Sequence, residues 1–261
     1  MSETTELMPI EPDSLKLAHS VTVEFQRCNG APGLQQVKWL AHQLAQEGFH
    51  PSPSVANQEI IAAEDVDALV EDRYEDYESK QQIMGGLLRS VSFQLLLSDL
   101  SKDTWCSFGW MVFKGEYVQV TLGGSVYATK GARRDRQPPF AEALLTMAKK
   151  MYLFVQPTYG FIEDPDVGGH PPGDKSSRRH QIVTLSWVNF FGPDYVAKYG
   201  RELLANIPGH HTEDLSDGGL LYQSRANIVP EDELAHRRWQ REAQQYLAAH
   251  GITIRFGYGY G

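Results

Sequence analysis

Residues 181–200 read QIVTLSWVNFFGPDYVAKYG and carry the clearest folding signal in the chain. Residues 182–191 are mostly β-branched, aliphatic or aromatic, which predicts a strand that is buried on both faces. Gly192 and Pro193 then end the strand, because proline lacks a backbone donor and its φ suits the first position of a helix. Asp194 follows in the first turn, where a carboxylate favours the positive helix end. The apolar stripe expected of this helix consists of Val196, Tyr199, Leu203 and Leu204.

The rest of the chain alternates between strand and helix patterns. Strand patterns occupy residues 20–27, 87–97, 105–113, 117–127, 152–162 and 220–223. Helix patterns occupy residues 34–48, 140–150 and 230–250, in addition to the acidic segment described below. In the first of these helices the inward positions are Val37, Leu40, Ala41 and Leu44. The strands at 105–113 and 117–127 predict a hairpin, because the connection between them is short and contains glycine.

This order of elements predicts an α+β fold with a mixed, mostly antiparallel sheet and helices packed on it. A strand-helix opening recurs at residues 20–48 and 181–204, which leaves two similar halves as an option. Residues 1–18 are polar and contain two prolines, so a flexible tail is expected there. Residues 19–261 are expected to form a single α+β domain.

The composition restricts the classes of partner. The chain of 261 residues has 24 basic and 33 acidic residues and a net charge of −9, which disfavours general nucleic-acid binding. The same charge suits a basic partner protein. Cys28 and Cys106 lie in no C-x-x-C motif and are typical of buried thiols in a reducing compartment. The N-terminus lacks a signal-peptide core and no segment is apolar enough to span a membrane, so a cytoplasmic protein without a cofactor is expected.

Residues 59–78 carry nine acidic residues and a single basic residue, Arg73. The apolar members Val66, Leu69, Val70, Tyr74 and Tyr77 recur every three or four positions and predict one narrow stripe on a helix. Carboxylates at the same spacing repel each other, and no lysine in the run offsets this cost. One interpretation is a docking face for a basic partner, and the other is a solvated amphipathic helix. The candidate contact residues are Glu64, Asp65, Asp67, Glu71, Asp72, Tyr74, Glu75, Asp76 and Glu78.

A second candidate site is the polar Gly/Pro-rich loop at residues 163–179. Its carboxylates and imidazole could hold a divalent ion, which makes a metal-dependent hydrolase the alternative function. The spacing matches neither an EF-hand nor H-E-x-x-H. The residues concerned are Glu163, Asp164, Asp166, His170 and Asp174, with His180 just beyond.

Other polar clusters favour no chemistry. The adjacent His210 and His211 point in different directions and indicate a surface loop. The chain has no G-x-S-x-G motif. Gly123-Gly124 does not belong to a phosphate-binding loop, because the G-x-x-x-x-G-K-[ST] pattern is absent there. The basic segment at residues 130–139 is an isolated cationic spot that could pair with the acidic helix.

The words LSWVNFF at 185–191 and LSDGGLLY at 215–222, joined by the G-P helix start, resemble the C-terminal half of bacterial immunity proteins for polymorphic toxins. The nearest resemblance is to immunity proteins paired with restriction-endonuclease-like secreted toxins, including type VI secretion effectors. The layout of the middle of the chain is similar, with a Gly-rich strand at 117–125, a helix and LFVQPTYGFIE at 153–163. The resemblance covers roughly residues 105–250, and the acidic helix departs from it.

The resemblance implies a cytoplasmic inhibitor without enzymatic activity, which covers the active site of a cognate toxin. A nuclease is the expected toxin class, because a protein that holds phosphates is basic where an acidic inhibitor can imitate nucleic acid. A homodimer is an open alternative that the same sequence allows.

Overall fold

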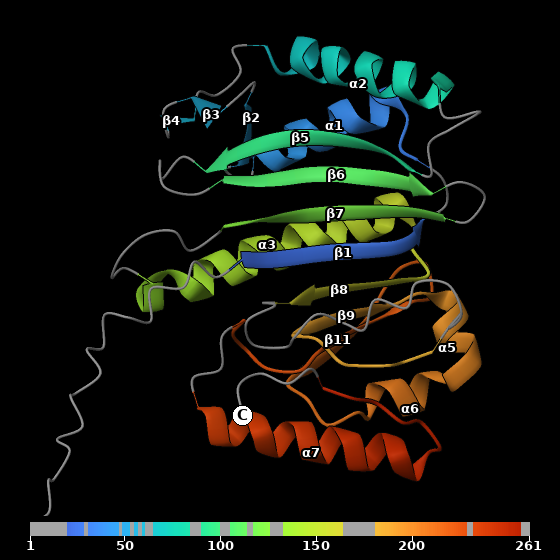
Figure 1. Ribbon diagram of the computed structural model, residues 1–261. Coiled ribbons are helices and arrows are strands. Elements are labelled where there is room, and N and C mark those ends of the chain that lie inside the picture. Colours follow the sequence, from blue (N-terminus) through green and yellow to red (C-terminus); the bar gives the residue numbers. More distant parts are fainter. Residues whose placement is uncertain are drawn as a thin grey trace, which may run out of the picture.

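The computed structural model describes residues 20–28, 31–46, 49–52, 55–56, 59–60, 65–83, 90–99, 105–113, 117–125, 133–163, 181–228 and 232–256. Figure 1 shows their arrangement, with a long sheet and helices packed along it. The strands are β1 (Ser20–Cys28), β2 (Phe49–Ser52), β3 (Val55–Ala56), β4 (Glu59–Ile60), β5 (Ser90–Asp99), β6 (Trp105–Phe113), β7 (Tyr117–Ser125), β8 (Tyr159–Glu163), β9 (Val188–Phe191), β10 (His211–Asp214) and β11 (Leu220–Gln223). The helices are α1 (Leu34–Gln46), α2 (Val66–Ile83), α3 (Arg133–Val155), α5 (Pro193–Tyr199), α6 (Arg201–Ala205) and α7 (Glu233–Ala249).

The main sheet has nine strands in the order β10-β11-β9-β8-β1-β7-β6-β5-β2, and β3 pairs with β4 in a separate ribbon. Every pairing between the strands described is antiparallel. The predicted α+β fold with a mostly antiparallel sheet and packed helices is therefore confirmed. The predicted hairpin is also confirmed, with Phe113 opposite Tyr117 at its closed end.

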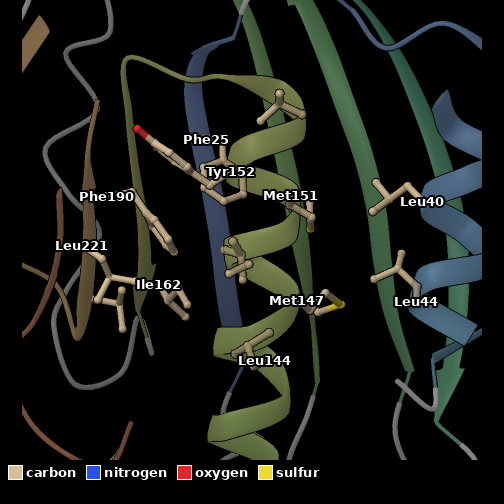
Figure 2. Packing of buried hydrophobic residues seen from close by; sticks show 14 of the residues in the cluster. Phe25, Leu40, Leu44, Leu144, Met147, Met151, Tyr152, Ile162, Phe190 and Leu221 are labelled. Carbon is tan, nitrogen blue, oxygen red and sulfur yellow. The ribbon is translucent and has the colours of Figure 1, made fainter. Parts of the chain in front are cut away.

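Strand β9 is shared by two hydrophobic clusters, because successive side chains of a strand point to opposite faces. Val188 and Phe190 belong to a cluster with α1, α2 and α3, whereas Phe191 belongs to a cluster with α5, α6 and α7. Figure 2 shows the first cluster, in which Phe190 lies beside Tyr152 of α3. All four residues of β9 are buried, so the expectation of a strand covered on both faces is confirmed.

The two clusters also show how the recurring strand-helix units relate to the sheet. Both units are present, as β1 with α1 and β9 with α5. The predicted inward residues of α1 are all buried. They pack in the first cluster, whereas Tyr195 of α5 packs in the second. The helices of the two units therefore cover opposite faces of the sheet.

The strand predicted at residues 182–191 is shorter than expected, because only residues 188–191 are paired as a strand. Residues 182–187 are mostly buried, but several of their backbone N–H groups donate to side chains instead of to a neighbouring strand. The backbone N–H of Ser186 donates to Asn189 Oδ1 at 3.1 Å, and the amide nitrogen of Asn189 donates back to the Ser186 carbonyl at 3.1 Å. The apolar run thus indicates burial correctly, whereas the strand length was wrong.

Helix α5 begins at Pro193 as predicted, with Gly192 as its N-cap and Asp194 in its first turn. The helix ends earlier than expected, because Gly200 adopts φ 84° and separates α5 from α6. Glycine tolerates this left-handed region without a steric penalty. Leu204 of α6 is buried, and Val196, Tyr199 and Leu203 pack against the second cluster.

Helix α3 is longer at both ends than residues 140–150. It starts at Arg133, so residues 133–139 of the basic segment belong to the helix. At its other end residues 152–155 are helical, although the sequence pattern predicts a strand there. The buried positions Leu144, Ala148, Met151, Tyr152 and Val155 continue one helical stripe, which explains the extension. The strand of this region, β8, follows only after Gln156, whose φ is 44°, and Pro157.

The C-terminal part differs from the sequence expectations in two places. The edge strand β10 was missed, because its sequence HTED is polar and exposed. Helix α7 starts after Asp232, whose side chain caps Leu234 and Ala235, and not at Pro230. Leu234, near the start of this helix, is 74% exposed. Residues 1–18, Gly48 and the side chains of Cys28 and Cys106 lie outside what the structure describes.

Substitution of Gly192 tests the close contact between the start of α5 and the backbone of Pro157 and Thr158, just before β8. An added Cβ would lie 2.6 Å from the Thr158 carbonyl oxygen and 2.7 Å from that of Pro157, so the backbone must shift. We expect Gly192→Ala to lower the free energy of unfolding by about 1–3 kcal/mol in chemical denaturation. Gly33→Ala is the matched control, because its Cβ would meet only Gln36 Oε1 at 3.7 Å. Equal stability of both variants would contradict this packing.

Buried tyrosines predict a loss of stability at alkaline pH. Burial raises the pKa of Tyr152, Tyr159 and Tyr222, and the carboxylate of Asp217 raises that of Tyr152 further. In the unfolded chain these phenols ionise near pH 10, so above that pH the unfolded state binds fewer protons than the native state. We expect the free energy of unfolding to be unaffected by these groups below about pH 10 and to fall as the pH rises further. Denaturation at several pH values measures this fall, and Tyr152→Phe should make it shallower; an unchanged slope would contradict the account.

Candidate protein-binding site

Helix α2 holds most of the acidic candidates, and Asp65 sets its start. Asp65 Oδ1 accepts a hydrogen bond from the Ala68 backbone N–H at 3.0 Å, and its carbonyl accepts one from Leu69 at 3.2 Å. An aspartate in this position satisfies donors that the first helical turn leaves free. The carboxylate of Asp65 therefore stabilises the helix, and Glu64 lies outside the described residues.

The predicted apolar stripe of α2 is confirmed and attaches the helix to the first cluster. Val70 and Tyr77 are buried, and Val66, Leu69 and Tyr74 are partly buried against them. The Tyr74 hydroxyl donates to the Pro32 carbonyl at 3.3 Å, just before α1. Burial of the Tyr74 phenol is the main cause of its raised pKa, with a contribution from the charge of Glu78. Tyr74 therefore anchors α2 and offers only part of its side chain to a partner.

Two acidic side chains of α2 pair with α1. Lys38 donates to Glu71 and lies 3.8 Å from Asp67, while His42 Nε2 lies 3.0 Å from Asp67 Oδ1. The hydrogen bond to Glu71 is the largest cause of the raised pKa of Lys38, and the charge of Asp67 adds to it. No lysine lies within the acidic run, as the sequence shows, but a compensating cation comes from a neighbouring helix. The side chains of Arg133, Arg134 and Arg136 lie outside what the structure describes.

Three carboxylates of α2 remain available. Asp76 pairs with Lys80 one turn along the helix, an exposed contact of little energetic weight. Asp72, Glu75 and Glu78 are exposed, and no residue in the described part of the chain forms an ion pair with them. They follow one another at three-residue spacing and so share one side of the helix. We call these three residues the acidic row.

An exposed tryptophan lies on the adjacent helix and was missed by the sequence analysis. Trp39 of α1 is 46% exposed, and its ring stacks on Phe154 of α3 with 5.6 Å between the ring centroids. It directly follows Lys38, which pairs with α2. The available signal was its position outside the inward stripe of α1, because an apolar residue there has no core to fill.

Of the candidate metal ligands in the loop at residues 163–179, Glu163 has a structural role. Glu163 ends β8 and is 4% exposed. Its Oε2 accepts the Trp187 backbone N–H at 2.8 Å, and its Oε1 lies 3.3 Å from Arg225 Nη2. Among the residues that the structure describes, no group of three or more histidine, cysteine or acidic side chains could hold a metal ion. The remaining candidates, Asp164, Asp166, His170, Asp174 and His180, lie outside them.

His210 and His211 are both exposed, in agreement with a surface position. His211 begins β10 and does not lie in a loop, and its Nε2 is 3.8 Å from Glu213 Oε2. The pair therefore lies at the polar edge of the sheet.

A groove along α7 is the second feature that the sequence analysis missed. It has a volume of about 760 Å³ and is lined by Leu234, Arg237, Arg238, Gln240, Arg241, Gln244, Arg255 and Phe256. We call it the arginine groove. The signal in the sequence was RRWQR at 237–241, since Arg241 lies three and four positions after Arg238 and Arg237 and is therefore their neighbour on the helix surface.

Comparison of the chain with protein-family models, with curated proteins and with solved structures finds no match. Within the described residues, no helix has the length and apolar character needed to cross a membrane.

The buried pair of Glu163 and Arg225 predicts a strong effect on stability. Removal of the guanidinium would leave a buried carboxylate without its cation and also remove the bond from Arg225 Nε to the Ile228 carbonyl, which is 3.0 Å long. We expect Arg225→Ala to lower the free energy of unfolding by about 3 kcal/mol or more. Arg201→Ala is the control, because its pair with Asp214 is exposed and should cost less than about 1 kcal/mol. Similar losses in both variants would contradict a structural role for Glu163.

Proposed function

We propose that the protein is an immunity protein that binds a cognate toxin and covers its active site, with the acidic row of α2 at the contact. The observation that carries this proposal is a set of free carboxylates on a helix whose other side is fixed. Tyr77 and Val70 bury the inner side, and Lys38 holds the α1-facing side. The acidic row is thus preorganised, so that little side-chain and backbone entropy is lost on binding.

The charge of the row favours a basic partner, and a nuclease is the best-matched toxin class. A nuclease surface that holds phosphates carries cations, and carboxylates on a rigid helix can occupy the same positions. Complementary charge also speeds encounter, which suits an inhibitor that must act before its toxin does. The net charge of −9 extends this field beyond the contact itself.

Trp39, on the helix that pairs with α2, is a second candidate contact and would act as an apolar anchor. Exposed tryptophans are frequent among the residues that dominate binding energy, since a large ring is desolvated when a partner covers it. Its stacking on Phe154 limits its rotation before binding. The paired helices α1 and α2 thus supply charge that attracts a partner and an aromatic ring that can retain it.

Charge reversal of the acidic row tests this function. We expect the triple variant Asp72→Lys, Glu75→Lys and Glu78→Lys to lose protection when it is co-expressed with the proposed cognate toxin domain. In a binding assay with that domain, the affinity should fall more than about a hundredfold, mainly through slower association and with strong salt dependence. The positions are exposed, so the fold should remain intact.

The matched control carries the same change in charge at other exposed positions, as Glu142→Lys, Asp194→Lys and Glu202→Lys. It should protect as well as the unaltered protein. Trp39→Ala is a second variant that should raise the dissociation rate with little salt dependence. Full protection by the triple variant of the acidic row would contradict its role in the contact.

A further inference from the structure

The arginine groove is built by α7 and the segment that follows it. Gln244 Nε2 donates to the Ile254 carbonyl at 3.3 Å, and the backbone N–H of Arg255 donates to the Val183 carbonyl at 2.9 Å. The Phe256 ring packs edge-on against Trp239, with 5.2 Å between the ring centroids. The segment is therefore fixed alongside the helix, and the groove between them is a built feature of the fold.

The groove concentrates positive charge in an acidic protein. Arg238, Arg241 and Arg255 are exposed, and no residue in the described ranges forms an ion pair with any of them. None of the described residues that line the groove is acidic. Unpaired guanidinium groups that share one concave surface are a binding site for carboxylate or phosphate oxygens, which they can contact through paired N–H donors.

The groove also has an apolar part. Leu234 is 74% exposed at one end of the lining, and Phe256 contributes a partly buried ring. Gln240 also lines the groove, where its amide nitrogen lies 3.2 Å from His236 Nε2 and its amide oxygen can accept a hydrogen bond from a peptide backbone. Exposure of a leucine costs free energy that an apolar contact from a ligand would recover.

We propose that the arginine groove binds an acidic polypeptide segment that carries one apolar side chain. The guanidinium groups would pair with its carboxylates, and Leu234 with Phe256 would hold the apolar side chain. A nucleic acid fits less well, because its affinity depends on many phosphate contacts along an extended basic surface and this chain carries net negative charge. A small phosphate ion would leave the apolar part of the groove unused.

This surface is separate from the acidic row. Figure 1 shows α2 and α7 at opposite ends of the sheet, with the strands between them. An acidic segment in the groove would therefore leave α2 uncovered. The inference does not depend on the proposed function, since no residue of α2 contributes to it.

Fluorescence anisotropy with a labelled short peptide of glutamates and aspartates around one phenylalanine tests the proposal on the full chain. We expect saturable binding that weakens as the salt concentration rises from about 50 to about 200 mM. Arg238→Glu with Arg241→Glu should weaken it about tenfold or more. Lys80→Glu with Lys198→Glu makes the same change in charge outside the groove and should leave binding close to that of the unaltered protein.

Leu234→Ser tests the apolar part independently. It should weaken binding of the phenylalanine peptide and leave unchanged the weaker binding of a peptide with serine in that place. Circular dichroism confirms that each variant is folded. The proposal is overturned by absence of peptide binding, by equal binding of the groove variant, by an oligonucleotide or inorganic phosphate that binds as tightly, or by self-association that the groove variant abolishes.

Discussion

The burial of β9 on both faces is the constraint on which the rest of the structure depends. Phe190 packs with Phe25 and Tyr152 on one face, and Phe191 packs with Tyr159 and Tyr195 on the other. A strand between two apolar clusters cannot shift by one residue without exchanging its two sets of side chains between them. β9 pairs with β8 along one edge and with β11 along the other, so its position also determines which helices cover each face of the sheet.

The surfaces available for binding lie at the two ends of this core. At one end, the first cluster holds α1 against the sheet, and α1 in turn holds α2 through Lys38 and the contact of Tyr74 with Pro32. At the other end, the second cluster buries Ala243 and Leu247 of α7 and leaves its arginines exposed. The core therefore separates an acidic helix from a cationic groove, so the two do not neutralise each other within one chain (Figure 1).

Sequence periodicity predicted the fold where a side-chain pattern alone determines the element. The inward residues of α1 and the start of α5 at Pro193 are examples. A side-chain pattern does not predict which hydrogen-bond partner the backbone of a buried residue has. The segment before β9, whose N–H groups bond to the side chains of Asn189 and Glu163, therefore has a strand pattern but forms no strand. It also did not predict contacts between helices. Lys38 and Glu71 are 33 positions apart, so only the folded chain shows which carboxylates of α2 are neutralised and which are free.

Hydrogen exchange of the protein with and without the cognate toxin domain that we propose as its partner tests the central claim most directly. The account predicts that complex formation slows amide exchange in the C-terminal half of α2, around Asp72, Glu75 and Glu78, and in α1 around Trp39. Amides of α7 should exchange at the same rate in both states. Slower exchange confined to other elements, with α2 unchanged in a stable complex, would contradict the claim that the acidic row contacts the toxin.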